Sequence, residues 1–79
     1  MPSFYFDVHH DGGITIDDEG VDLPDMRAAG KQALVALGEA ILHDADELKS
    51  SATKIEVRDA ANRVVLRTSA MVVFEVLQS

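Results

Sequence analysis

Hydrophobic and polar positions alternate near the start of the chain. The period of two over residues 4–9 predicts a half-buried strand, because successive side chains of a strand point to opposite faces. One face carries Phe4, Phe6 and Val8, and the other carries Tyr5, Asp7 and His9. The Asp-Gly-Gly turn signal at 11–13 and the apolar segment 14–16 extend this strand into a predicted hairpin.

The spacing of apolar residues changes to three and four between Met26 and Leu48, which predicts one long amphipathic helix. Pro24 fits the first helical turn, and either Asp22 or Asp25 is expected to cap the free N–H groups there. The apolar stripe consists of Met26, Ala29, Ala33, Leu34, Leu37, Ala40, Ile41 and Leu48.

Four further helix positions bear on packing. Gly30 and Gly38 lie eight residues apart on roughly the same side, where a glycine usually permits a close approach, here to the sheet. Val35 and Leu42 lie partly off the main stripe and widen the apolar surface. We expect these two side chains to be available to a second subunit.

Alternation returns in the second half of the chain. Segments 54–59 and 64–68 predict two strands joined by a turn at 60–62. In the predicted register, the numbers of paired residues sum to 121, and Ile55 lies opposite Leu66 on the apolar face. The same register places Val57 opposite Val64. A bend at Ser69-Ala70 and a last strand over 71–77 are predicted to follow.

Together these elements predict an α+β fold with the order β-β-α-β-β and a last strand, forming a single domain over residues 1–79. The helix is expected to pack on one face of a small, mostly antiparallel sheet. The predicted core comprises Phe4, Phe6, Val8, Met26, Ala33, Leu37, Ile41, Ile55, Val57, Val64 and Leu66.

Composition narrows the classes of partner. The 79 residues include 14 acidic and 7 basic side chains, giving a net charge of −7, and no cysteine. This charge disfavours nucleic acid and anionic membranes, whose binding depends on Lys and Arg. Disulfides are excluded, and a core of this size rarely supplies more than ~3–5 kcal/mol. Self-association is therefore the expected source of additional stability, with a homodimer favoured over larger homo-oligomers.

The N-terminal segment lacks the pattern of a secretory signal, because no basic residue precedes Arg27 and an acid stands at position 7. No apolar run approaches the ~18 residues needed to cross a bilayer. These two observations predict a cytoplasmic protein.

Two motifs resemble a known family. They are Glu-Gly-Val-Asp-Leu-Pro-Asp at 19–25 and Ile-Glu-Val-Arg-Asp at 55–59, and they stand in an aromatic strand, alanine-rich helix and strand-turn-strand order. In this arrangement, residues 3–68 resemble DUF6894, a family of small bacterial proteins of unknown function. The resemblance implies the same order of elements. It does not assign an activity, a cofactor or a site residue to this chain.

Imidazole and carboxylate groups come together in sequence at His9, His10, Asp17 and Asp18. If the hairpin forms, mixed nitrogen and oxygen ligands of this kind suit zinc, nickel or manganese, so a metal or small-ligand site is one alternative. Solvated turn and loop charges are the favoured interpretation. Asp7 and His9 stand two apart on a strand, too far for a direct general-base pair, and no nucleophile motif accompanies them. We therefore expect neither catalysis nor a cofactor.

An interaction module remains the favoured interpretation, with a second copy or another protein as its partner. On the polar sheet face, the candidate contact residues are Tyr5, Asp7, Arg58 and Arg67, although an ordinary solvated face is the favoured interpretation there. In the C-terminal apolar run, they are Met71, Val73 and Phe74. This run is expected either to form an inner strand of its own sheet or to add to a neighbouring subunit.

Overall fold

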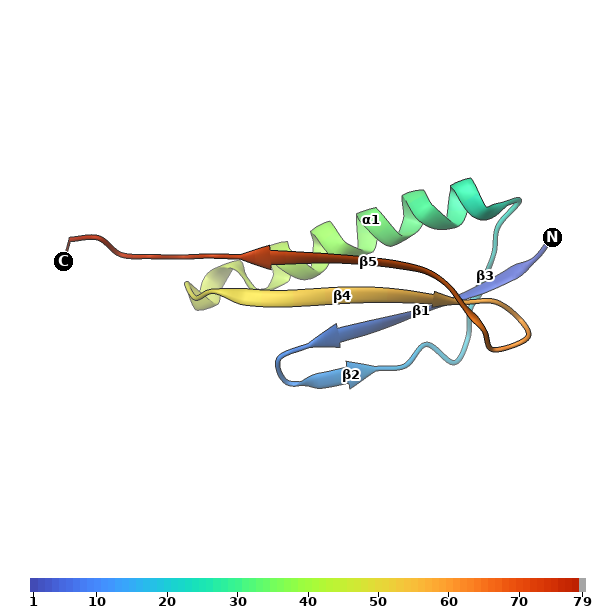
Figure 1. Ribbon diagram of the computed structural model, residues 1–79, viewed down its shortest axis with the longest axis horizontal. Coiled ribbons are helices and arrows are strands. Elements are labelled where there is room, and N and C mark those ends of the chain that lie inside the picture. The colour runs from blue at the N-terminus through green and yellow to red at the C-terminus, as the bar shows by residue number, and fades with distance from the viewer. Residues whose placement is uncertain (79) are drawn as a thin grey trace.

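The computed structural model describes residues 1–78 and confirms the α+β fold (Figure 1). The strands are β1 (Ser3–His10), β2 (Gly13–Thr15), β3 (Val21–Asp22), β4 (Ser51–Arg58) and β5 (Val64–Val72). The helix α1 spans Met26–His43 and is followed by a 3-10 turn at Ala45–Glu47. All pairings are antiparallel, in the order β2-β1-β4-β5, with β3 pairing to the start of β1.

The core lies between α1 and the two strands β4 and β5 that it mainly contacts. Its buried apolar residues are Phe4, Ala29, Ala33, Leu37, Ile55 and Val57. Phe6, Val8, Ile41 and Leu66 pack against them and are partly buried. The prediction for Met26 was wrong: it is 45% exposed because the buried face of α1 begins at Ala29.

The predicted helix was too long at its C-terminal end. It begins as predicted at Met26, after the N-cap Asp25, whose Oδ1 accepts a hydrogen bond of 2.9 Å from the Ala28 N–H. It ends at His43, and Leu48 adopts a left-handed conformation with φ of 50°. The acidic residues Asp44, Asp46 and Glu47 account for the early end, since carboxylates are unfavourable at the negative end of the helix dipole.

Neither helix glycine is needed for a close approach. A Cβ added to Gly30 would lie 4.0 Å from Cδ1 of Leu66, which is ordinary contact, and one added to Gly38 would meet no described atom within 4 Å. The small residues that do meet the sheet closely are the buried Ala29 and Ala33.

The β4–β5 hairpin differs from the predicted register by two residues. Ile55 pairs with Thr68 and Val57 with Leu66, so the sums are 123. Then a bulge shifts the register, and Arg58 pairs with Val64. The bulge moves Val64 off the core face, where it is 49% exposed, and Val65 packs against the core in its place.

The predicted bend at Ser69-Ala70 and separate last strand at 71–77 were wrong. The strand β5 continues straight through these residues to Val72, and residues 73–78 extend beyond the sheet without strand pairing (Figure 1). Moreover, β5 is an edge strand, so the apolar run is not an inner strand of its own sheet. We call residues 73–78 the tail. Its direction continues that of β5 along the long axis of the molecule (Figure 1).

Candidate interaction surface

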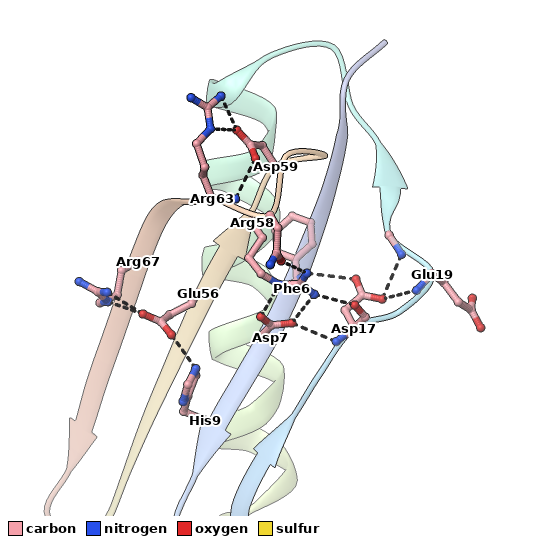
Figure 2. A network of polar contacts seen from close by, with 12 residues as sticks. Phe6, Asp7, His9, Asp17, Glu19, Glu56, Arg58, Asp59, Arg63 and Arg67 are labelled. Carbon is pink, nitrogen blue, oxygen red and sulfur yellow. Dashed lines mark hydrogen bonds and ion pairs between the residues drawn. The ribbon is translucent and has the colours of Figure 1, made fainter.

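One edge of the sheet, along β1, is closed by the Asp17 side chain. The short strands β2 and β3 pair with the two ends of β1 and leave Tyr5, Phe6 and Asp7 between them. Asp17 fills this gap: its Oδ2 accepts the Phe6 N–H at 3.0 Å, and its own N–H donates to Asp7 Oδ1 at 3.0 Å (Figure 2). The other carboxylate oxygen, Oδ1, accepts the Glu19 and Gly20 N–H groups, both at 3.0 Å.

A buried ion pair ties this closure to the hairpin of β4 and β5. Arg58 donates from Nε to Asp7 Oδ2 at 2.7 Å, and from Nη2 to Asp7 Oδ1 at 3.0 Å and the Asp17 carbonyl oxygen at 2.8 Å. A third nitrogen, Nη1, donates to Asn62 Oδ1 at 2.8 Å. Bidentate pairing of this kind fixes geometry as well as charge. Arg58 therefore connects three segments that are distant in sequence.

Both carboxyl groups of this cluster are held in the ionised form. The Arg58 hydrogen bonds lower the pKa of Asp7 and outweigh the opposing effect of its burial. For Asp17, burial raises the pKa, but the N–H groups of Gly20, Phe6 and Glu19 together outweigh it, and the net pKa is lowered. The two acids thus remain charged at neutral pH.

Tyr5 covers Arg58 on the helix-free face. The guanidinium carbon lies 5.2 Å from the centroid of the Tyr5 ring, a cation–π distance. On its other side the ring approaches Gly20, where an added Cβ would lie 2.6 Å from Cε2 of Tyr5. Gly20 has a φ of +74°, so both the backbone and the ring require glycine at this position.

This arrangement bears on the interface predicted for the polar face. Asp7 is only 5% exposed and faces Arg58 and Asp17, so it offers little surface to a partner. Tyr5 and Arg58 are partly buried in the same cluster. The cluster satisfies its own charges, and its chemistry is that of a structural tie.

A second row of polar side chains crosses the helix-free face from β1 to β5. His9 Nε2 lies 2.7 Å from Glu56 Oε1. Among the described residues, this buried ring nitrogen has no hydrogen-bond partner. Glu56 Oε2 accepts from Arg67 Nε at 2.7 Å, and this hydrogen bond lowers the pKa of Glu56 (Figure 2). Arg67 ends the row at the sheet edge, with its side chain 60% exposed.

The structure does not bring the four candidate metal ligands together. His9 faces Glu56, and His10 Nδ1 accepts the Gly12 N–H at 3.2 Å. The Asp17 oxygens accept backbone N–H groups, while Asp18 is exposed. Across residues 1–78, no group of three or more His, Cys, Asp or Glu side chains is placed to hold a metal ion.

The alternation of backbone hydrogen bonds along the strands shows which N–H and C=O groups of β5 point away from β4. Phe6 directs its N–H away from β4, toward Asp17, so alternate residues such as Asp7 bond to β4. Asp7 pairs with Glu56, and the next residue of β4, Ile55, therefore faces β5. Its partner is Thr68. Even-numbered residues of β5 thus bond to β4, and odd-numbered residues point outward.

The outward backbone groups belong to three consecutive odd-numbered residues of the strand, Arg67, Ser69 and Met71. Val73 follows in the same alternation, because the Phe74 N–H points back and donates to Ser50 Oγ at 2.9 Å. The side chains of this odd set share the helix-free face, as the Glu56–Arg67 contact shows. Those of the even set face α1, where Leu66 and Ala70 pack against the core.

Exposed apolar side chains continue along this open edge. Met71 is 76% exposed and Phe74 42%, and Val73, Val76 and Leu77 are also exposed. The structure therefore places Arg67, Met71, Val73 and Phe74 along one edge of the sheet, which we call the open edge: the outer side of β5 from Arg67 to Val72 together with the tail. Sequence reasoning missed Ser50, which holds the start of the tail and carried no motif.

Comparison with known proteins identifies the family of the chain. A family model described as a domain of unknown function (DUF6894) matches residues 3–71. The chain belongs to this family. The DUF6894 match begins with β1 and ends one residue before the end of β5, so it contains the Arg58 cluster and stops where the tail begins. No curated protein and no solved structure matches the chain. No helix within residues 1–78 is long and apolar enough to cross a membrane.

Proposed function

We propose that this chain is a non-enzymatic interaction module that forms a homodimer through the open edge. The observation that carries the proposal is the place of β5: a nine-residue strand at the edge of the sheet, followed by an extended apolar tail. Unpaired strand edges are templates for pairing with another chain. A second copy supplies an identical edge and pairs with it by strand addition.

The free energy of pairing would come from the apolar side chains of the open edge. Covering apolar surface at this edge contributes roughly 25 cal/mol for each Å² removed from water. Met71, Val73 and Phe74 are all exposed in the single chain. Six apolar residues form the buried core within residues 1–78, so removing part of the surface of three more from water would add to the stability of this small domain.

A second copy fits this edge better than an unrelated partner because the edge carries both of its own complementary charges. Arg67 lies near one end of the run and Glu75 near the other, with apolar or small residues between them. An antiparallel two-fold pairing brings opposite ends together. An edge of uniform charge would place a like charge opposite either Arg67 or Glu75, which favours self-recognition.

The test is the oligomeric state of untagged, chelator-free protein, measured by native mass spectrometry and analytical ultracentrifugation over a range of concentrations. We expect a dimer of apo mass. Met71→Lys and Val73→Lys place a charge on the open edge and should shift the protein to monomer. Ile16→Lys is the matched control, because Ile16 is also exposed but lies beyond β2, away from β5.

A wild-type protein that stays monomeric at every concentration would contradict the proposal, as would a dimer that Ile16→Lys weakens as much as Met71→Lys does. The same spectra address the alternative of a metal protein. A mass excess that disappears in His10→Ala would favour the site predicted from His9, His10, Asp17 and Asp18.

A further inference from the structure

Resting on the proposed dimer, we infer its register: the two-fold axis passes beside Met71, and Arg67 of each copy faces Glu75 of the partner subunit. Paired residues in this arrangement have numbers that sum to 142. The inference concerns the geometry of the open edge and can fail while the dimer itself stands.

The alternation of backbone hydrogen bonds along β5 first restricts the registers in which two copies can pair. Only the odd-numbered residues of β5 direct their N–H and C=O groups outward, so hydrogen-bonded pairs across the two copies must join odd to odd. The sum is then even, and the axis passes through a residue position. Ser69, Ala70, Met71 and Val72 correspond to sums of 138, 140, 142 and 144.

The positions of the charged side chains then favour one of these four registers. With 142, Arg67 faces Glu75 of the partner subunit, Ser69 faces the partner's Val73, and Met71 faces its own copy. With 140 or 144, Arg67 faces Val73 or Leu77 of the partner subunit and gains no opposite charge across the interface. With 138, Glu75 faces Arg63 of the partner subunit, but Arg63 precedes β5, lies beyond the bulge and already contacts Asp59 at 2.8 Å.

Arg67 is placed to pair with Glu75 of the partner subunit. Its Nε and Nη2 are both 2.7 Å from Glu56 Oε2, and the side chain is nevertheless 60% exposed at the sheet edge. An acid from a partner strand would extend the polar row across the helix-free face, from His9 through Glu56 and Arg67. Opposite charges that face each other across an antiparallel pair are favourable.

The helix side of the same register is apolar. Phe74 of one copy faces Thr68 of the partner subunit, and Val76 faces the partner's Leu66. Leu66 is only partly buried and lies 4.0 Å from the position of a Cβ on Gly30. The tail would therefore pass beside the Gly30 side of the partner's α1, where Leu34, one turn further along the helix, is exposed.

Single-cysteine variants test the register directly, since the chain has no cysteine of its own. In an antiparallel hydrogen-bonded pair the Cα atoms are about 5.5 Å apart, within the disulfide range. Under mild oxidation, Met71→Cys should give a disulfide-linked dimer. Ser69→Cys is the matched control: with a sum of 142 the two Ser69 positions are four residues out of step, roughly 13 Å along the strand.

A second pair of cysteine variants tests the same register while keeping Met71, in case the Met71 variant no longer dimerises. A mixture of Ser69→Cys and Val73→Cys chains should form the mixed disulfide, because 69 and 73 also sum to 142. Circular dichroism and native mass spectrometry under reducing conditions verify that each variant is folded and dimeric before oxidation.

The outcomes separate the register from the function. Self-linking of Ser69→Cys would place the axis at residue 69, and mixed linking of Ser69→Cys with Met71→Cys would place it at residue 70. Either result overturns the register, as does a reduced dimer that gives none of the expected disulfides. A wild-type chain that is monomeric would instead overturn the proposed function.

Discussion

At the scale of single residues, one arginine and two aspartates hold together segments that are far apart in the sequence. Arg58 reaches Asp7 and the Asp17 carbonyl oxygen with three hydrogen bonds, and the Asp17 side chain supplies the acceptor that the Phe6 N–H lacks between β2 and β3. Both acids have lowered pKa values for this reason. The cluster makes local folding depend on the charge of two carboxylates.

Acid should therefore destabilise the protein through Asp7 and Asp17. A pKa that is lower in the folded state means that the stabilisation is fully present above the unfolded pKa of ~3.9 and is lost as the pH falls through the folded pKa. The urea midpoint should fall steeply below about pH 4. Asp7→Asn should cost about 1.5–3 kcal/mol at pH 7, typical of hydrogen bonds to charged groups.

The control for this measurement is Asp18→Asn, which changes an exposed acid in the same loop. It should retain the wild-type urea midpoint and pH profile, whereas Asp7→Asn should show a shallower fall in acid. Equal acid sensitivity in Asp7→Asn and the wild type would show that the Asp7 carboxylate does not carry the effect.

At the scale of elements, each boundary has an identifiable cause. Asp25 starts α1 by accepting the Ala28 N–H, the acids after His43 end it, and the bulge at Arg58 and Val64 resets the hairpin. The helix has no acidic side chain in its first turn apart from this cap. Its N-terminal end accordingly depends on a single residue.

Removing the cap should have a measurable effect on the whole domain. Asp25→Ala should lower the free energy of unfolding by about 0.5–2 kcal/mol, because one helix N–H loses its acceptor. Chemical denaturation followed by circular dichroism measures this loss. Asp25→Ser, which also caps helices, should recover most of it, and an Asp25→Ala variant as stable as the wild type would show that the cap contributes nothing.

Local patterns predicted the elements better than their ends and pairings. Alternation at 4–9 and helical spacing from Met26 identified β1 and α1 because those signals depend on neighbouring residues. The β4–β5 register was wrong by two because a bulge carries no local signal. The role of Asp17 was missed because its acceptor function exists only where two strands leave a gap in the pairing of a third. Long-range geometry decides such features.

At the scale of the whole molecule, a run of exposed apolar side chains lies along the open edge: Met71, Val73, Phe74, Val76 and Leu77. The chain extends over 52 Å in its longest dimension, and the tail continues β5 past the end of the sheet (Figure 1). Arg67 and Glu75 flank the apolar residues between them. The proposed register pairs these two charges twice in each dimer.

Charge reversal should turn this homodimer into a heterodimer. Glu75→Arg alone and Arg67→Glu alone each place like charges opposite one another twice, and each should dimerise at least about 2- to 30-fold more weakly, from 0.2–1 kcal/mol for each exposed pair. Mixing the two variants restores both opposite pairs. Native mass spectrometry should then show the mixed dimer in excess.

Glu39→Arg, which reverses an exposed acid on α1, is the control and should leave dimerisation of the wild type unchanged. A statistical mixture of homodimers and heterodimers from the two reversed variants would contradict the Arg67–Glu75 pairing.

The closure of β1 by Asp17 would also limit the size of the proposed assembly. Joining two copies at β5 produces a continuous sheet that runs from β2 of one copy to β2 of the other. Each outer boundary is then a three-residue strand next to a gap already sealed by a carboxylate, with the acids Asp18 and Glu19 beside it. Such a boundary offers no template for a third chain. In the proposed dimer, association would be isologous and would end at two, so an exposed apolar strand would not lead to a filament.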